Sequence, residues 1–135
     1  MSAIHHFSPT VSDVEVSATW YQDVFGMVRL PITFPHHDKE ETGYAVLLLD
    51  PGSGVLIGLH HHEANEGEPF EECRTGLDHI GFRVPERVDL DRWADKLDGL
   101  GIAHSGVRDI EGPAPFSTLV FRDPDNIQLE FIHSA

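Results

Sequence analysis

Histidine is the residue type in this sequence that could do the most chemistry. The chain of 135 residues has ten histidines, more than its nine lysines and arginines together. Most of them stand in three runs, His5-His6, His36-His37 and His60-His61-His62. Imidazole is the commonest metal ligand in proteins, and its charge changes closest to neutral pH. The histidines therefore predict metal binding or proton transfer.

Composition narrows the classes of partner and of metal ligand. The 23 acidic residues give a formal net charge of −14, which argues against nucleic acid and anionic membranes as partners. Cys73 is the only cysteine, so the sequence offers neither an internal disulfide nor a thiolate pair for zinc. A metal would need His, Asp and Glu ligands. We expect a soluble, cytoplasmic protein, because no secretory signal and no apolar run of membrane-spanning length is present.

The chain matches itself at an offset of 73 residues. At this offset His6 coincides with His79, and both tryptophans coincide, Trp20 with Trp93. The further coincidences are Val11 with Val84, Gly26 with Gly99 and Asp50-Pro51 with Asp123-Pro124. Generic turn chemistry is the competing explanation, since Asp-Pro and Gly recur in loops. We favour a duplication because the predicted secondary structure repeats with it.

The first copy predicts a strand, a helix and three more strands. Alternating residues predict a strand at 4–11, and the capping box Ser12-Asp13-Val14-Glu15 then begins a helix that ends at Gly26. This helix is expected to bury Val16, Trp20 and Val24. The remaining strands are expected at 28–34, 43–50 and 55–60.

The second copy predicts the same order of elements. A strand at 77–84 leads to a helix closed by Gly101, whose inner stripe is Leu90, Trp93, Ala94, Leu97 and Leu100. Strands follow at 103–109, 116–122 and 127–133. The predicted fold class is therefore α+β, with two tandem β-α-β-β-β modules in one domain of residues 1–135. Module one covers about 4–62, a linker 63–75 and module two about 76–135.

Strand alternation selects the histidines that share a face. His6 and His79 lie on the polar phase of matching first strands, opposite the apolar phase expected under the helices. Glu130 interrupts the otherwise apolar last strand and needs a cation nearby, because an unpartnered buried carboxylate is costly. Two imidazoles and one carboxylate form a ligand set for a divalent metal. The competing interpretation is that both histidines are ordinary interior residues and that Glu130 forms a salt bridge with Arg83.

Four stretches of the sequence resemble the vicinal oxygen chelate superfamily, which includes glyoxalases, extradiol dioxygenases, fosfomycin-modifying thiol transferases and bleomycin-binding proteins. The resemblance covers nearly the whole chain. It rests on His6-Phe7-Ser8-Pro9-Thr10-Val11-Ser12-Asp13, Trp20-Tyr21-Gln22-Asp23-Val24-Phe25-Gly26, Gly76-Leu77-Asp78-His79-Ile80-Gly81-Phe82 and Phe121-Arg122-Asp123-Pro124-Asp125-Asn126-Ile127-Gln128-Leu129-Glu130. It implies an open, cup-shaped mixed sheet with the helices outside, and a homodimer.

The resemblance also implies a divalent metal in the cup, Fe²⁺, Mn²⁺, Zn²⁺ or Ni²⁺, held by His6, His79 and Glu130. A fourth ligand position falls on the last strand of the first copy, where the gapless offset points to Ile57. Alternation points instead to the opposite phase. There, either Gly58 leaves the position open or His60 supplies a fourth ligand; His60 could equally be a solvated residue at a strand end.

Such a site predicts a metal-dependent enzyme acting on a small molecule with adjacent oxygen atoms, with glyoxalase-like isomerase or lyase chemistry or extradiol ring cleavage. Candidates for proton transfer are His37, Tyr44 and His60, and candidates for binding substrate are Arg83 and Gln128. The alternative function is a metal-free protein that sequesters an antibiotic of the bleomycin type. The potassium-binding loop and basic cluster of a fosfomycin thiol transferase are not recognisable.

Overall fold

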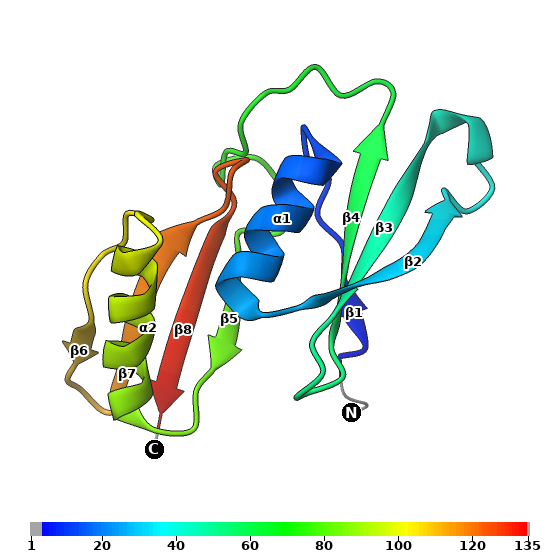
Figure 1. Cartoon of the computed structure of the whole chain (residues 1–135). Helices are drawn as coiled ribbons and strands as arrows, with labels where there is room; N and C mark the ends of the chain where they lie inside the picture. Colours follow the sequence, from blue (N-terminus) through cyan, green and yellow to red (C-terminus); the bar gives the residue numbers. More distant parts are fainter. Residues whose placement is uncertain (1–3, 135) are drawn as a thin grey trace. The chain divides into compact units, whose positions relative to one another are not determined.

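The computed structural model describes residues 4–134 of the chain, which forms two compact units, Met1–Glu68 and Pro69–Ala135. The first unit contains β1 (His6–Phe7), α1 (Val14–Phe25), β2 (Val28–Pro35), the short 3₁₀ helix η1 (Glu40–Thr42), β3 (Gly43–Leu49) and β4 (Leu56–His62). The second contains β5 (His79–Arg83), α2 (Arg87–Gly99), β6 (Arg108–Ile110), β7 (Phe116–Arg122) and β8 (Gln128–Ser134) (Figure 1).

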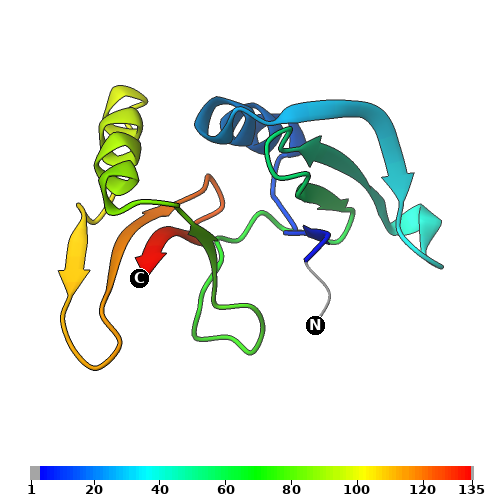
Figure 2. The same ribbon diagram turned by 90° about the horizontal axis from the view of Figure 1, so that it is seen from below.

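Each unit is a four-stranded mixed sheet with one helix. The strand orders are β1-β4-β3-β2 and β5-β8-β7-β6. The first strand of each unit pairs in parallel with the last, and the other pairings are antiparallel. In each unit the helix lies on one face of its own sheet (Figure 2). The predicted α+β class and the two tandem β-α-β-β-β modules are confirmed.

The start and the buried stripe of α1 differ from the prediction. Asp13, rather than Ser12, is the N-cap, and its carboxylate accepts hydrogen bonds from the backbone N–H groups of Glu15 and Val16. The helix ends at Gly26, as predicted, in a left-handed conformation with φ 68°. The buried residues are Val14, Ser17, Ala18, Tyr21 and Val24, while Val16 is 54% exposed. Of the predicted stripe, Val24 is buried and Trp20 is half-buried.

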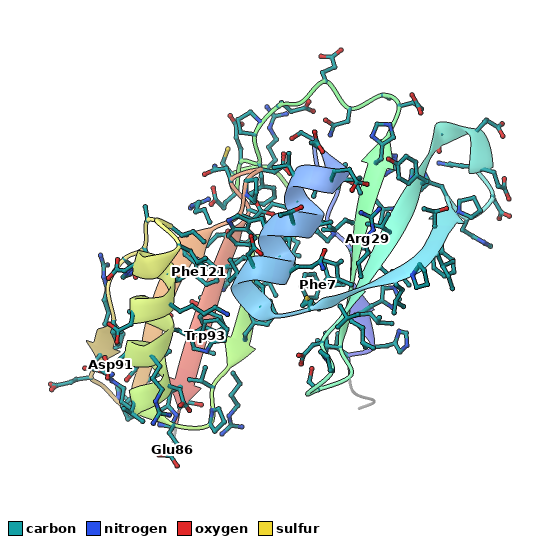
Figure 3. All side chains as sticks on the ribbon, viewed as in Figure 1. Phe7, Arg29, Glu86, Asp91, Trp93 and Phe121 are labelled. Atoms are coloured by element: carbon teal, nitrogen blue, oxygen red, sulfur yellow. The ribbon has the colours of Figure 1, made fainter. Side chains whose placement is uncertain are left out.

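The capping box that the sequence suggested for α1 occurs instead in α2, where Glu86 and Asp89 each bind the backbone of the other. Trp93 projects from α2 toward β8, where its ring stacks on Phe131 with 4.1 Å between centroids (Figure 3). Leu100, expected on the inner stripe, is exposed because it follows the last helical residue. No helix in the described part of the chain is both long and apolar enough to cross a membrane.

The alternation of the strands defines two faces of each sheet. Leu129 and Phe131 are buried on the side of α2, so Glu130 between them lies on the face away from that helix. In the first unit Ile57 and Leu59 are buried in the same way, and Gly58 and His60 take the other phase. Strand β1 is shorter than predicted: it covers only His6–Phe7, whereas the sequence predicted a strand at 4–11. The face away from the helix is therefore where each unit places its polar strand residues.

Candidate functional site

His79 and Glu130 meet on neighbouring parallel strands of the second unit. β5 carries His79, β8 carries Glu130, and the register pairs Gly81 with Glu130. Nε2 of His79 lies 3.7 Å from Oε1 of Glu130, too far for a hydrogen bond. Two ligands that each lie about 2.0–2.2 Å from one ion are no more than about 4.4 Å apart. The pair therefore fits two positions in the coordination shell of a single divalent ion.

A neighbouring residue holds each member of this pair from its other side. Nδ1 of His79 lies 2.6 Å from Oδ1 of Asp78, and the hydroxyl oxygen of Thr118 lies 3.2 Å from Oε2 of Glu130. Because a carboxylate only accepts, Asp78 keeps the proton on Nδ1, and the Nε2 atom of a neutral His79 then carries a lone pair. Metal-binding histidines characteristically have such an outer carboxylate. Neither Asp78 nor Thr118 was predicted from the sequence to contact the site.

The missing side chain of Gly81 leaves room for the carboxylate. A Cβ atom at this position would lie 3.1 Å from Oε1 and 3.5 Å from Cγ of Glu130. The glutamate can therefore extend across β5 toward His79. The side chain of Glu130 is 17% exposed, so it lies at the surface of its sheet rather than inside the core.

The first unit has the histidine of this arrangement without the carboxylate. β1 pairs with β4 in the register His6 to Leu56, as β5 pairs with β8 in the register His79 to Gln128. Two residues further along the last strand, Gly58 in β4 therefore corresponds to the glutamate of β8. The imidazole of His6 lies beside that of its neighbour in sequence, with 2.9 Å between their Nδ1 atoms.

The registers also decide between the two alignments that the sequence allowed. The gapless offset, which pointed to Ile57, was wrong, and alternation pointed to the right residue, Gly58. A Cβ atom at Gly58 would lie only 2.6 Å from the hydroxyl oxygen of Ser8. His60 lies on the same face two residues further on, bridged to Thr10. The first unit thus offers no carboxylate at the matching position.

Three imidazoles gather in the first unit and form what we call the three-histidine cluster, His36, His60 and His62. Their ligand atoms all lie within 4.8 Å of one another. The ring of His36, just after β2, lies 4.1 Å from that of His62 and 5.1 Å from that of His60, measured between centroids. Burial lowers the pKa of both His60 and His62, and the neighbouring imidazoles lower it further. The sequence singled out His60 as a site residue but missed His36 and His62.

The other two candidates for proton transfer lie away from this cluster. Tyr44 pairs with His61 across β3 and β4, and their rings are 5.2 Å apart. His61 alternates with His60, so Tyr44 lies on the opposite face of the sheet from His60. The imidazole of His37 is 96% exposed and lies 3.2 Å from Asp38. The structure therefore does not bring these three candidates together.

Arg83, a predicted substrate ligand, lies on the phase of β5 that carries His79. Its Nη2 atom is 3.4 Å from a carbonyl oxygen at the end of β8. In residues 4–134 the carboxylate of Glu130 lies beside the imidazole of His79, and no ion pair joins Glu130 to Arg83. The buried salt bridge between Arg83 and Glu130 that competed with a metal site is therefore not formed.

Gln128, the other predicted substrate ligand, is already hydrogen-bonded to an arginine that was not predicted as a site residue. Its Oε1 atom accepts a hydrogen bond of 3.1 Å from Arg122. Arg122 also forms an ion pair with Glu72 and donates to the carbonyl oxygen of Asn126. Gln128 is the cross-strand partner of His79, so this network lies next to the His79–Glu130 pair.

Comparisons with known proteins agree with the fold and the motifs. A family model described as the Glyoxalase/Bleomycin resistance protein/Dioxygenase superfamily matches residues 3–131. A solved glyoxylase/bleomycin resistance protein/dioxygenase domain from Frankia sp. EAN1pec is 31% identical in sequence to this chain. The structural match covers 100% of this chain and 99% of the Frankia domain, with a TM-score of 0.85.

Two relatives are enzymes by name. MhqA of Bacillus subtilis, a proposed ring-cleaving dioxygenase, is 24% identical over 96% of this chain, which spans only 39% of the length of MhqA. The metallothiol transferase FosB of Bacillus licheniformis is 27% identical over 94% of this chain and 72% of its own length. With the family model and the Frankia structure, these matches confirm the resemblance in the motifs: the chain belongs to the glyoxalase/bleomycin resistance protein/dioxygenase superfamily, the vicinal oxygen chelate proteins.

Proposed function

We propose that this protein is a metal-dependent enzyme that acts on a small molecule with adjacent oxygen atoms, its ion held by His6, His79 and Glu130. The contact of 3.7 Å between His79 and Glu130, each held from its other side by a polar neighbour, is the observation that carries the proposal. His6 is the third ligand by family resemblance and by its matching place in the first unit. Imidazole and carboxylate ligands together suit Fe²⁺, Mn²⁺, Zn²⁺ or Ni²⁺.

The residues around the ligands have separate tasks in this proposal. A divalent ion with open positions polarises substrate oxygens and stabilises negative charge that develops on them. Arg83, on the same phase of β5 as His79, binds an anionic group of the substrate through its guanidinium donors. Gln128 offers its amide N–H₂ group, because its carbonyl oxygen already accepts from Arg122.

Proton transfer is assigned to one of two predicted residues, His60 or Tyr44. The two lie on opposite faces of the pair β3 and β4, so they cannot both line the same site. His60 shares the face of Gly58, the position that corresponds to Glu130, which favours His60. Burial lowers the pKa of His60 and keeps it neutral, as a general base requires.

The reaction is proposed at the level of its class. Relatives named as a ring-cleaving dioxygenase and a metallothiol transferase support metal-assisted chemistry on small molecules. Extradiol ring cleavage and glyoxalase-like isomerase or lyase chemistry are the two variants to test. A homodimer in the cytoplasm completes the proposal, and light scattering measures its assembly.

Metal content tests the ligands directly. Elemental analysis of protein loaded separately with Fe²⁺, Mn²⁺, Zn²⁺ and Ni²⁺ is expected to show that His79→Ala and Glu130→Gln each lose about one ion per chain relative to wild type. The control, Glu111→Gln, removes an exposed glutamate of the same unit and should keep the wild-type content. Equal metal content in all of these variants would contradict the ligand assignment. No metal in the wild type after loading would favour the metal-free sequestering protein.

Activity assays then separate the two reactions. With the iron-loaded protein, oxygen uptake in the presence of catechols is expected for ring cleavage, whereas an ultraviolet assay with a hemithioacetal reports isomerase activity. The protein carrying Glu130→Gln should lose whichever activity is found. Activity that survives this substitution at the wild-type rate would overturn the proposed site.

A further inference from the structure

We propose that the three-histidine cluster is a second metal site, in which His36, His60 and His62 bind a divalent transition metal ion of the Zn²⁺, Cu²⁺ or Ni²⁺ class. Every ligand of this site comes from the first unit, and none belongs to the set His6, His79 and Glu130. Three imidazoles with a free fourth position form a complete ligand set for zinc.

The hydrogen bonds of His36 leave one of its nitrogens ready to bind an ion. The hydroxyl of Thr42 donates its proton to the carbonyl oxygen of Lys39 at 2.7 Å, and the same oxygen lies 2.9 Å from Nδ1 of His36. Since that hydroxyl proton is used, Nδ1 must be the donor and Nε2 carries a lone pair. Nε2 is buried without any hydrogen-bond partner, and His36 as a whole is only 7% exposed. A buried acceptor without a partner is costly, and a metal ion relieves that cost.

Small residues on β3 let the three rings meet. Gly43 is the cross-strand partner of His62, and Ala45 is the cross-strand partner of His60. A Cβ atom at Gly43 would lie 2.8 Å from Cε1 of His36, so any larger residue would separate His36 from His62. The chain thus provides both the ligands and the space between them.

The distances between the ligand atoms also allow the cluster to close around an ion. Tetrahedral zinc–nitrogen bonds of about 2.0–2.1 Å put each pair of ligand nitrogens about 3.3–3.4 Å apart. The ligand atoms now lie within 4.8 Å of one another, so side-chain shifts of about 1 Å or less close the site. His60 and His62 are only partly buried and can make these shifts.

Binding would have two consequences for the first unit. In the order β4-β3-β2, the ion would join the end of β4 to the segment after β2 across the intervening strand. An imidazole that binds the ion has no lone pair left to accept a proton. His60 therefore serves as the general base of the proposed reaction only in chains whose three-histidine cluster holds no ion.

The experiment is a titration of the full chain with Zn²⁺ alone, in a background that carries His79→Ala and Glu130→Gln. This background is expected to bind about one Zn²⁺ per chain with a raised thermal midpoint. Adding His36→Ala or His62→Ala should weaken binding by more than the roughly 10–100-fold that loss of an outer partner costs. The matched controls are His37→Ala and His61→Ala, which remove the sequence neighbours that lie outside the cluster and should leave binding unchanged.

A second pair of variants tests the outer partner without touching a ligand. Thr42→Val removes the acceptor of the His36 Nδ1–H and should weaken Zn²⁺ binding about 10–100-fold, whereas Thr42→Ser keeps the hydroxyl and the affinity. Circular dichroism establishes that each variant is folded, and His62→Ala decides the test should the buried His36→Ala fail to fold. Absence of Zn²⁺ binding in the background, or equal losses for His61→Ala and His62→Ala, would overturn the second site.

Discussion

Glycines on the strands decide where the larger polar side chains of this protein can lie. Gly81 gives Glu130 room on the second unit's sheet. In the first unit the arrangement is reversed: Gly58 takes the position of Glu130, and Ser8, which has a side chain, takes the position of Gly81. Gly43 allows His36 and His62 to meet. A polar site on a sheet requires a small neighbour as much as it requires the functional residue.

Gly43 provides the first prediction at this scale. Its φ of 149° is strained for other residues, and a Cβ atom would lie 2.0 Å from the carbonyl oxygen of His61. We expect Gly43→Ala to destabilise the protein by about 2–4 kcal/mol, measured as a lower thermal midpoint. The control is Gly99→Ala at the end of α2, where no atom lies within 4 Å of the added Cβ atom. This variant should be more stable than the wild type by up to about 1 kcal/mol. A similar midpoint for both variants would refute this account.

The residues of the site differ in how well the sequence could reveal them. Alternation identified Gly58 as the counterpart of Glu130, and the same rule would have added His62 to His60, two residues away. His36 could not be found in this way, because it follows β2 and its burial depends on the turn that brings Thr42 to it. Asp78 precedes β5, outside the regular strand, so strand alternation does not apply to its contact with His79.

At the scale of elements, the sequence predicted the order of strands and helices but not all of their ends. Hydrophobic periodicity carries the order, which the two units share. Ser12 and Asp13 are both good N-cap residues, and only the observed bonds to the helix backbone show that Asp13 caps α1. The predicted burial of Val16 was also wrong, because Val14, Ala18 and Tyr21 lie on the buried face of α1. Sequence patterns therefore predict that an element exists more reliably than they predict where it begins and ends.

An ion-pair network ties α2 to β6 in the second unit. Arg87 at the start of α2 donates to both carboxylate oxygens of Asp109, at 2.6 and 2.9 Å, and to Asp91 at 2.9 Å. The hydroxyl of Ser117 also donates to Asp109. The hydrogen bonds from Arg87 and then from Ser117 lower the pKa of Asp109 to about 2. β6 has only three residues, and this network joins it to the start of α2.

The network predicts how stability depends on pH. Because the folded pKa of Asp109 lies below its ordinary value of 3.8, its stabilisation is fully present above about pH 4 and is lost as the pH falls toward 2. The thermal midpoint of Asp109→Asn should therefore lie below that of wild type at pH 6, and the gap should close near pH 2. Asp95→Asn, an exposed change on α2, should show no such closing gap. The effect should also weaken with salt, because the pair is exposed.

The whole molecule carries a large excess of negative charge that no single site explains. Of the 23 acidic and nine basic residues, ten acids but only two bases, Arg29 and Lys39, belong to Met1–Glu68. Arg29 is already paired with Glu15, at 2.6 Å. This unit also contains the three-histidine cluster, so its field attracts divalent cations. The same excess charge opposes folding through mutual repulsion.

This repulsion predicts that sodium chloride stabilises the protein even though it weakens individual ion pairs. Raising the salt from about 0.02 to 0.5 M shortens the screening length to a few ångströms, so repulsion among many carboxylates falls. The thermal midpoint of the wild type should rise. The double variant Glu66→Lys, Glu68→Lys changes exposed residues and moves the net charge from −14 to −10. Its thermal midpoint at low salt should therefore be higher than that of the wild type, and salt should raise it by less. A midpoint that falls with salt in both proteins would show instead that specific pairs such as Arg87–Asp109 outweigh the repulsion.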